Sequence, residues 1–572
     1  MKTHPHPNPP LEGEGVHPHP NPPTARQAGR AGSAGAELCS AKPPLRPLEG
    51  EGEGSPSRGG GVAFQWLVSH CGGLVLGAAL GLLAAAAHGA DWRLESGVSA
   101  RATYTDNVNL APSGREEGDL YTEVRPRIGI RGEGGRLKLS ADYSPRLLYY
   151  VNQTSRSRIA HELASSAKLE AIENFFFIDA NADISQEFVS PFGPQPGDVG
   201  LDTDNRIETR RLRVSPYIQG RTVGNIDYLG RYETTWTDTD RESLANARRT
   251  KWLGRLSAPT RRIGWSAEAF REETKFEDQQ TFTNNLGRLI VTYQVVPTFR
   301  VEARGGYEQN DFGLTDQEGA IYGAGLDWRP TPRTAVNGFW EERFFGSSFG
   351  ANLTHRTRLT AWRLSASRDI SDFPQELFTL QPGFTPLLLD AIFAARIPDP
   401  VERFNAVVQF LQENQIPLFL NTPLRFFTQR IFLRERYEAS AAINGARNTV
   451  VFSVFYSDNE PVSTTNATLP PELLLVDQPF TQTGASISYT LRLTRLSNVN
   501  LLLSHTRTKR EQTLAGSRPD SEQDSVRLTY STQLAPKTRG LAGARYQQFD
   551  SDDPLFNNYN EVAVFVGLDH RF

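Results

Sequence analysis

The chain has 572 residues, with 61 Lys and Arg against 65 Asp and Glu and a formal net charge of −4 at pH 7. This balance lacks the basic excess of nucleic-acid binders, so we expect no nucleic-acid partner. Both cysteines, Cys39 and Cys71, lie in the first 90 residues, which excludes a disulfide framework or a thiolate metal site from the rest. Beyond residue 90 no apolar run is long enough for a membrane-spanning helix, which excludes an inner-membrane helical bundle.

Residues 1–60 are interpreted as a low-complexity, non-native N-terminal extension. The heptapeptide HPHPNPP occurs at His4–Pro10 and again at His17–Pro23, as expected for a translated DNA repeat upstream of the true start. A His-rich tract can also bind metal, which is the alternative interpretation.

Residues 61–90 are predicted to be a signal peptide. The run CGGLVLGAALGLLAAAA, from Cys71 to Ala87, is apolar, too short to span a membrane and followed by small residues. Cleavage after Ala87 or Ala90 would place the mature N-terminus near Asp91. We therefore expect export across the inner membrane of a Gram-negative bacterium.

One pattern recurs over residues 91–572. Apolar and polar residues alternate with period two for about ten residues at a time, the length of a membrane-crossing strand. The alternation is clearest over 92–104, 137–149, 176–184, 226–236 and 299–307. A soluble sandwich of this size would need some strands that are apolar on both faces, and the chain has almost none.

The connections between these segments alternate between tight turns and longer polar loops. Tight turns are predicted at 132–135, 173–174, 259–264, 296–298, 329–333, 444–447 and 536–539. Longer loops are predicted at 106–118, 189–206, 238–247, 277–284, 309–318, 457–479 and 549–559. Strict alternation is typical of an outer-membrane barrel, with turns in the periplasm and loops outside. We predict an all-β fold, a transmembrane antiparallel up-and-down β-barrel of about 20–22 strands over 91–572.

The strand number is the open point of this prediction. We count 21 strands, whereas a barrel with both ends in the periplasm needs an even number. Either a short strand near 373–380 gives 22, or one strand has been divided and the number is 20.

The alternation breaks over residues 369–427, which we interpret as a helical insertion. Asp399 is suited to cap a helix with Pro400 at its first position, and a second helix is predicted over Thr385–Ile397. The pair would be an extracellular cap or a plug in the lumen. A barrel this wide would leak if empty, which favours a plug, and an ordinary loop decoration is the alternative.

The chain ends in NEVAVFVGLDHRF, residues 560–572, a strand with one apolar side. That strand must pair with the first one to close the ring. The apolar parity resembles the C-terminal signal of bacterial outer-membrane proteins, although His570 stands where an aromatic residue is common. The predicted assembly-signal residues are Val564, Val566, Leu568 and Phe572. The partners implied are the outer-membrane barrel assembly machinery, outer-membrane lipid and lipopolysaccharide.

The polar parity of the strands carries many arginines. The lumen-lining candidates are Arg93, Arg101, Arg136, Arg146, Arg300 and Arg304. Such a wall could guide an anionic polymer. Alternatively, the arginines pair with lumen carboxylates and brace the barrel, which the near-neutral net charge somewhat favours.

Catalytic chemistry is not expected from this chain. GSSFG at 346–350 matches G-x-S-x-G, but it falls in a predicted outer loop and not on a strand-to-helix elbow. His161, His355, His505 and His570 are scattered, without metal-ligand spacing. We predict no enzyme activity, no cofactor and no metal.

Several segments resemble a known family, the outer-membrane β-barrel proteins encoded with PEP-CTERM/exosortase and exopolysaccharide loci. They are YTDNVNL (104–110), WRPTPRT (328–334), HRTRLTAW (355–362), ARIPDPVERFNAVVQFLQENQIP (395–417) and NGARNTVVFSVF (444–455). The resemblance implies a non-enzymatic barrel that supports exopolysaccharide production or export, with polysaccharide export components as further partners. General passage of solutes, and a structural or adhesive surface barrel with an occluded lumen, are the alternatives.

Overall fold

The computed structural model describes residues 91–572 except 202, 242–243, 259–261, 278–280, 314–315, 373–384, 394–396, 398, 414–429, 464–477 and 511–519. The predicted N-terminal extension and signal peptide lie outside the described residues. So does the segment 373–380, for which a strand was considered.

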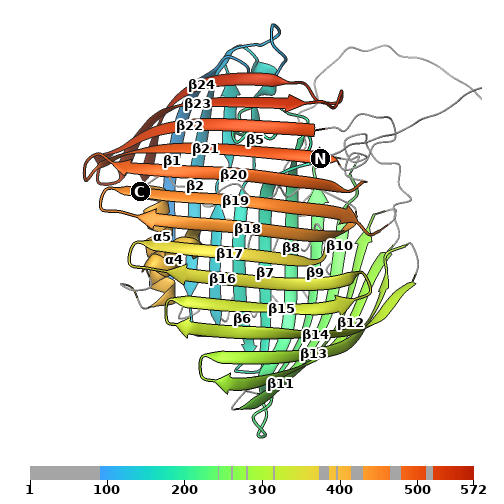
Figure 1. The fold of residues 1–572 in the computed structure, drawn as a ribbon. Coiled ribbons are helices and arrows are strands. Elements are labelled where there is room, and N and C mark those ends of the chain that lie inside the picture. The colour runs from blue at the N-terminus through green and yellow to red at the C-terminus, as the bar shows by residue number, and fades with distance from the viewer. Residues whose placement is uncertain are drawn as a thin grey trace, which may run out of the picture. The chain divides into compact units, whose positions relative to one another are not determined.

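Strands make up nearly all of the described chain (Figure 1). The first half contains β1 (Asp91–Thr105), β2 (Asp119–Glu133), β3 (Leu137–Tyr143), β4 (Arg146–Tyr150), η1 (Thr154–Arg156), β5 (Arg158–Ala160), β6 (Leu163–Ile172), β7 (Phe176–Phe188), β8 (Arg206–Arg221), β9 (Asp227–Thr239), β10 (Ala247–Ala258), β11 (Ile263–Phe276) and β12 (Thr281–Val296). The second half contains β13 (Phe299–Asp311), β14 (Asp316–Thr331), β15 (Thr334–Arg343), β16 (Gly346–Arg356), β17 (Thr360–Asp372), α4 (Thr385–Phe393), α5 (Pro400–Glu413), β18 (Ile431–Asn444), β19 (Asn448–Pro461), β20 (Phe480–Arg492), β21 (Ser497–Arg510), β22 (Asp520–Ala535), β23 (Thr538–Ser551) and β24 (Tyr559–Arg571).

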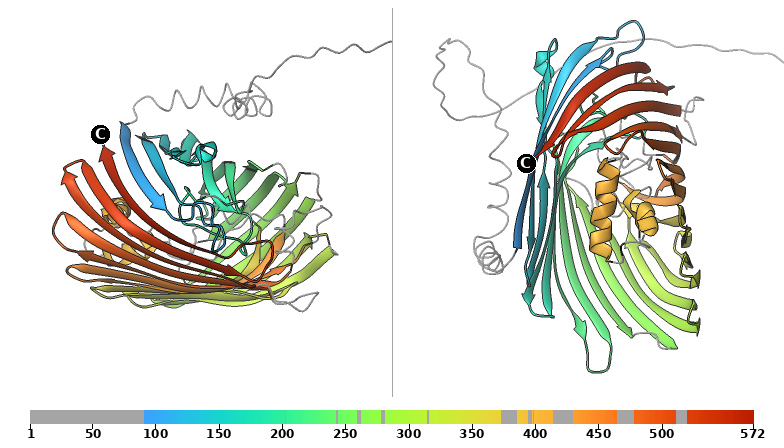
Figure 2. Two further views of the ribbon diagram at one scale, coloured as in Figure 1. Left: turned by 90° about the horizontal axis from the view of Figure 1, so that it is seen from above. Right: turned by 90° about the vertical axis from the view of Figure 1, so that its left-hand side faces the viewer.

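The strands form one closed antiparallel ring. Each pairs with its neighbours in chain order, and β24 pairs with β1 from Ala563–Thr105 to Arg571–Gly97. The pairs β3 with β4 and β5 with β6 are halves of two interrupted strands, so the wall has 22 strands. The predicted transmembrane-type β-barrel architecture is confirmed, and Figure 2 shows the wall from two further sides.

The interruption between β3 and β4 has a local cause. Pro145 follows Ser144 at the break and has no backbone N–H to donate to the ladder. Ser144 still donates its amide to the carbonyl of Glu162, which lies in the break between β5 and β6. The wall therefore continues across the gap with altered pairing.

The number 22 agrees with one of the two even values expected. Among the described residues, β17 pairs directly with β18 from Thr360–Ile443 to Asp372–Ile431, and the segment near 373–380 lies outside these residues.

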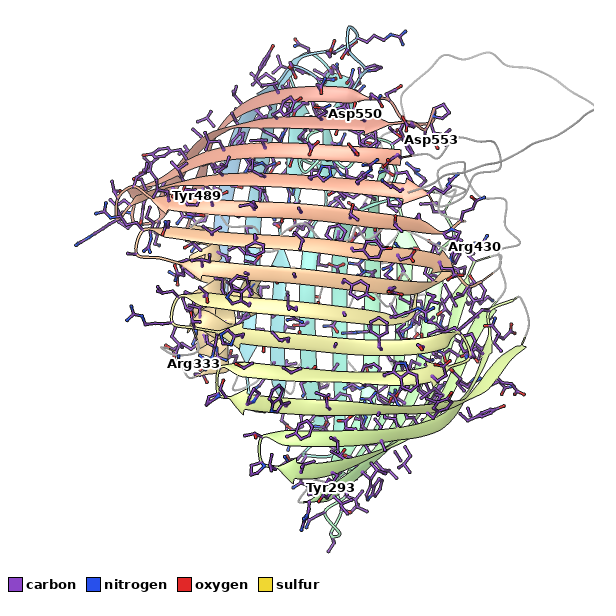
Figure 3. All side chains as sticks on the ribbon, in the orientation of Figure 1. Tyr293, Arg333, Arg430, Tyr489, Asp550 and Asp553 are labelled. Atoms are coloured by element: carbon purple, nitrogen blue, oxygen red, sulfur yellow. The ribbon has the colours of Figure 1, made fainter. Side chains whose placement is uncertain are left out.

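Tight turns lie at one end of the ring, and the other end carries the longer connections together with three short ones. In Figure 3, Arg333 marks the turn end, and Arg430, Asp550 and Asp553 mark the loop end. At the loop end, Phe344 and Phe345 alone connect β15 to β16, and four residues each separate β11 from β12 and β13 from β14. Strict alternation of connection lengths was therefore wrong at these hairpins, although sidedness holds.

Each strand separates an apolar outer face from a polar inner face. On β24, Val564 and Val566 are 53% and 60% exposed on the outside, whereas Glu561 on the inner parity is fully buried. Aromatic residues lie near both edges of the outer face, Tyr104 and Tyr149 toward the loops and Trp265 and Trp328 toward the turns. The predicted parity is confirmed, and the strands present an outward apolar band that suits contact with lipid and not with water.

Described helices do not reach the length and apolarity that a membrane crossing requires.

Gly323, on the inner face of β14, lies where the backbone of β15 approaches too closely for a side chain. A Cβ on Gly323 would lie 2.8 Å from the Cα of Glu341 and would also contact the carbonyl of Trp340. We expect Gly323→Ala to destabilise the barrel by about 1–3 kcal/mol, as overpacking does. Urea titration of the lipid-refolded barrel measures this. Gly287→Ala is the matched control, since its Cβ would meet nothing within 4 Å, and equal losses in the two variants would contradict the assignment.

Candidate functional site

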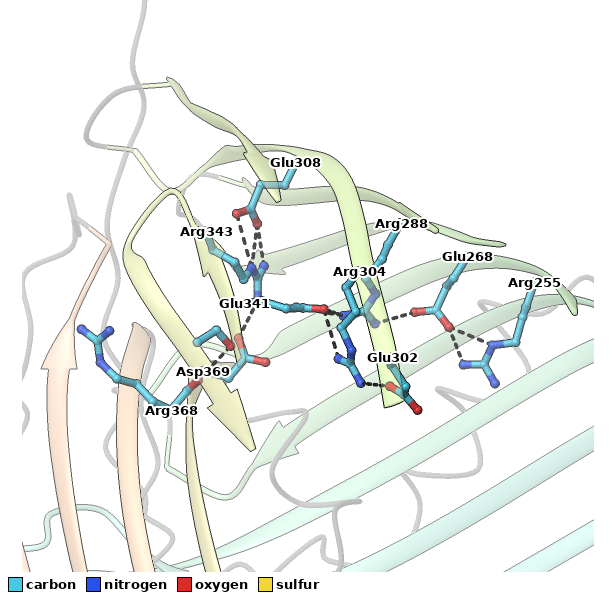
Figure 4. Close-up of polar contacts among 11 residues, drawn as sticks. Arg255, Glu268, Arg288, Glu302, Arg304, Glu308, Glu341, Arg343, Arg368 and Asp369 are labelled. Atoms are coloured by element: carbon cyan, nitrogen blue, oxygen red, sulfur yellow. Dashed lines mark hydrogen bonds and ion pairs between the residues drawn. The ribbon is translucent and has the colours of Figure 1, made fainter. Parts of the chain in front are cut away.

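The inner wall carries a connected row of ion pairs across β10–β15 (Figure 4). Nε of Arg255 lies 2.8 Å from Oε2 of Glu268, and Arg288 lies 3.3 Å from the other oxygen of the same carboxylate. Glu341 accepts from Arg288 at 2.9 Å and from Arg304 at 3.1 Å. The row is continuous because each carboxylate serves two guanidinium groups.

Glycines on β14 make this row possible. Gly319, Gly323 and Gly325 fall on the inner parity of β14, opposite to the outward Tyr322 and Trp328. Without side chains there, Glu341 on β15 reaches over β14 to arginines on β12 and β13. The sequence showed the glycines but not the partners that use their space.

A second group of ion pairs lies toward the loop end of the same side. Arg343 contacts Glu308 at 2.6 Å and Asp369 at 2.7 Å. Arg249 contacts Glu272 at 2.6 Å, and both side chains are largely buried. In this half of the wall the arginines connect strands that are adjacent or two apart, which is the bracing that the alternative interpretation of the sequence proposed.

The six lumen-lining candidates do not all lie in the same environment. Those on strands take the inner parity, and they are Arg93, Arg101, Arg146, Arg300 and Arg304. Arg146 pairs with Glu162 at 3.0 Å, and Arg304 belongs to the row described above. Arg136 lies instead in the turn before β3, largely exposed and 3.5 Å from Glu173, so the lumen placement was wrong for this residue.

The four residues predicted as an assembly signal lie on the outside. Val564, Val566, Leu568 and Phe572 are all exposed on the apolar parity. Phe572 donates its backbone amide to the carbonyl of Ser96, at the seam between the last and first strands. Their role in assembly stays a prediction.

The connection between β7 and β8, residues 189–205, folds into the ring. It was predicted as an external loop, but Val189, Phe192 and Leu201 are fully buried. Three apolar side chains within a Pro- and Gly-rich segment were the signal for this in the sequence. Burying them inside the mouth removes them from water, which an outward loop would not do. We call residues 189–205 the inner loop.

The inner loop reaches the opposite side of the mouth. The rings of Phe192 and Phe480, the first residue of β20, have centroids 5.6 Å apart. Thr508 on β21 donates its hydroxyl to the carbonyl of Pro191 at 3.1 Å. Gln195 and Gln523 on β22 exchange two hydrogen bonds of 3.0 and 2.8 Å. These contacts hold a segment that starts on β7 against β20–β22.

Residues at the base of the inner loop give it a defined shape. Asn205 accepts from the amide of Ser190 at 2.8 Å and donates to the carbonyls of Ser190 and Pro194. Arg206 donates to the carbonyls of Pro196 and Leu201. Because these bonds satisfy backbone groups inside the loop, its conformation is preorganised.

A buried acidic residue of the inner loop forms its strongest tie to the wall. Asp198 lies 2.7 Å from Arg545 on β23, and Arg545 also lies 2.7 Å from Glu561 on β24. Burial alone would raise the pKa of Asp198, but the charges of Arg545, Arg527 and Arg101, with a hydrogen bond from the amide of Gly200, hold it below its usual range. The stabilisation from this carboxylate is therefore present above its unfolded pKa of about 3.9 and is lost as pH falls through the lower folded value.

The predicted helical pair is present and lies inside the wall. The amide of Glu402 donates to Asp399 Oδ1 at 2.7 Å, which is the predicted N-cap of α5. Leu389 of α4 and Val407 and Leu411 of α5 are fully buried in one cluster with Ala361, Ala442 and Val451. These wall residues belong to the inner parity near the turn end, and Figure 2 shows the two helices inside the wall.

No catalytic constellation or metal cluster is assembled from the features considered in the sequence. GSSFG lies at the start of β16 and not in a loop, and Ser348 is fully buried, donating to the carbonyl of Arg368 at 3.0 Å. Within the described ranges, no three His, Cys, Asp or Glu side chains converge on a possible metal position.

Comparisons with known proteins give similar folds but no family. Neither a family model nor a curated protein matches the sequence. Among solved structures, the siderophore receptor PirA from Acinetobacter baumannii has a TM-score of 0.44 at 8% identity, covering 84% of this chain and 80% of that one. The FrpB iron transporter from Neisseria meningitidis has a TM-score of 0.46 at 8% identity, covering 84% and 81%. OccAB2 from Acinetobacter baumannii has a TM-score of 0.32 at 11% identity, covering 84% and 98%. At these values the similarity assigns no cargo to the chain.

Proposed function

We propose that the chain is a non-enzymatic outer-membrane barrel that admits hydrophilic solutes to a narrowed lumen. The observation that carries this proposal is the division of every strand into an outward apolar face and an inward face of arginines and carboxylates. An apolar outer face matches lipid, and ring closure leaves no unpaired strand edge in the hydrocarbon. The predicted signal peptide supports placement in a Gram-negative outer membrane.

A narrower form of this proposal is that the barrel supports exopolysaccharide production or export. Its support is the sequence resemblance together with inward arginines such as Arg101 and Arg300, which would face an anionic polymer in transit. Lipopolysaccharide, the barrel assembly machinery and polysaccharide export components remain the proposed partners.

A structural or adhesive surface barrel with an occluded lumen is the second candidate. Two observations favour it: the inner loop crosses the mouth at the loop end, and α4 with α5 occupies the lumen farther down. Planar-bilayer recordings of the purified barrel separate the candidates. Silence both with and without the helices would favour the structural role.

Glu341→Gln tests whether ions pass the arginine row. Neutralising this buried carboxylate leaves the positive charges of Arg288 and Arg304 less compensated, so we expect the reversal potential in a salt gradient to shift toward anion selectivity. Glu342→Gln is the matched control, because Glu342 lies on the outward parity next to it. If Glu341→Gln still conducts and its reversal potential is unchanged, ions do not pass along this row of ion pairs.

A further inference from the structure

The carboxylate of Asp198 lies among three arginines from different wall strands. Arg545 on β23 forms the 2.7 Å ion pair, whereas Arg527 on β22 and Arg101 on β1 act on the same carboxylate through their charges. Asp198 itself comes from the inner loop and not from the wall. The wall thus supplies the three arginines and Glu561, and the inner loop supplies the carboxylate of Asp198.

We infer that Arg101, Arg527 and Arg545 form a binding site for a solute oxyanion, carboxylate or phosphate, and that Asp198 occupies this site as a built-in competitor. The inference rests on the proposed function, since it names the chemistry of a solute that the lumen would admit. It also gives the inner loop a role, because a solute that displaces Asp198 removes the loop's strongest tie to the wall.

Two of the three arginines have bonding capacity left for a ligand. Among the described residues, none forms a hydrogen bond or ion pair with Arg527, and one of its terminal nitrogens lies 3.8 Å from an ideal Cβ position at Gly197, beside Asp198. Arg101 stacks at 5.4 Å from the ring centre of Phe565, and its buried Nε has no partner in the described part of the chain. Guanidinium groups match oxyanions through paired N–H donors.

Formal charge favours an incoming anion at this place. Three guanidinium groups face two carboxylates, Asp198 and Glu561, within the group. Glu561 belongs to β24 and is also held by the hydroxyl of Thr105 at 2.8 Å, so it stays with the wall. Withdrawal of Asp198 would therefore leave a second uncompensated positive charge, which an oxyanion of similar size can neutralise. Glu123, directly opposite Arg101 in the β1–β2 ladder, adds a third carboxylate, and Arg146 at 3.9 Å from it adds a fourth guanidinium group, so the excess of one positive charge is unchanged.

Backbone geometry shows how the carboxylate of Asp198 is positioned for exchange. Its Oδ1 accepts from the amide of Gly200 at 2.9 Å, and its Oδ2 faces Arg545. A phosphate or carboxylate with one oxygen on Arg545 could take the remaining donors of Arg527 and Arg101. The loop would then be held by its weaker contacts to β20–β22.

The test is calorimetric titration of the detergent-solubilised full chain with inorganic phosphate and, separately, with succinate. We expect Asp198→Ala to bind at least one of them about tenfold more tightly than the unsubstituted chain, or about 1.4 kcal/mol, because the competitor is gone. Adding Arg527→Ala to Asp198→Ala should abolish the gain. Asp552→Ala, at an exposed loop-end position, is the control and should bind like the unsubstituted chain.

The phosphate and succinate titrations distinguish the possible ligands. Tighter binding of phosphate alone identifies phosphate as the ligand chemistry, and tighter binding of succinate alone identifies a carboxylate. No gain for either anion in Asp198→Ala, or a gain that survives Arg527→Ala, overturns the inference. Circular dichroism of each variant establishes that the barrel is folded. Because the readout is binding, a barrel that binds the anion but never conducts would refute solute passage and leave the site intact.

Discussion

Arg545→Ala is expected to destabilise the barrel by about 3–5 kcal/mol, the usual result of removing one partner from a buried ion pair. The side chain of Arg545 is 2% exposed and holds Asp198 and Glu561 at 2.7 Å each. Its removal would leave both buried carboxylates without the guanidinium group that pairs with them directly. Urea titration in lipid vesicles and loss of the heat-modifiable band on gels measure the effect.

Two further variants separate the ion-pair explanation from general damage at the seam. Arg333→Ala removes an exposed arginine at the turn end and should change stability little. Adding Asp198→Asn and Glu561→Gln to Arg545→Ala should restore part of the loss, because neutral amides are cheaper to bury than carboxylates. A loss of stability below about 1 kcal/mol in Arg545→Ala lies in the range of an exposed ion pair. It would contradict the assignment of Asp198, Arg545 and Glu561 as a buried ion-pair cluster.

Replacing residues 383–417 with a Gly-Ser linker is expected to raise single-channel conductance several-fold. α4 and α5 occupy the lumen near its turn end, and their buried residues attach them to the inner faces of β17–β19. Their removal leaves the wall ladder intact, since β17 pairs directly with β18. Planar-bilayer recordings on the refolded barrel measure the change.

A pair of point variants tests the same claim without a deletion. Leu389→Asp puts a charge at a fully buried contact and should undock the helices, giving flickering openings. Phe404→Asp makes the same change at a position 43% exposed on α5 and should leave the recording unchanged. Identical traces from the deletion and the unsubstituted chain would show that the helices do not limit conduction.

The barrel itself was predictable because its physics is local. Along β24, from Val562 to Leu568, apolar and polar residues alternate because one face of the strand contacts lipid and the other contacts water. The polarity of each residue therefore indicates the face on which it lies. The helix cap at Asp399 was predictable for the same reason, since the side chain and the amide of Glu402 that it binds lie within four positions of the chain.

The arrangement of the lumen was not predictable, because it depends on residues far apart in the chain. Asp198 and Arg545 meet across the closed ring, and neither flanking sequence indicates the other. The direction of the inner loop depends on where Phe480 and Tyr150 stand after closure, as Tyr150 donates to the carbonyl of Gly200 at 2.6 Å. Alternation indicates on which face of a strand an arginine lies, but it does not indicate its partner. In a turn, such as the one that contains Arg136, alternation does not indicate a face either.

Accessibility along β24 in lipid vesicles tests the central claim most directly, that lipid contacts the apolar parity and the lumen contacts the other. The native cysteines both precede residue 91, so single cysteines can be placed at Ala563, Val564, Phe565 and Val566 and spin-labelled. We predict that oxygen dissolved in lipid relaxes the labels at 564 and 566 far more than those at 563 and 565. Equal relaxation at all four positions, or preferential relaxation of 564 and 566 by a water-soluble nickel complex, would contradict it.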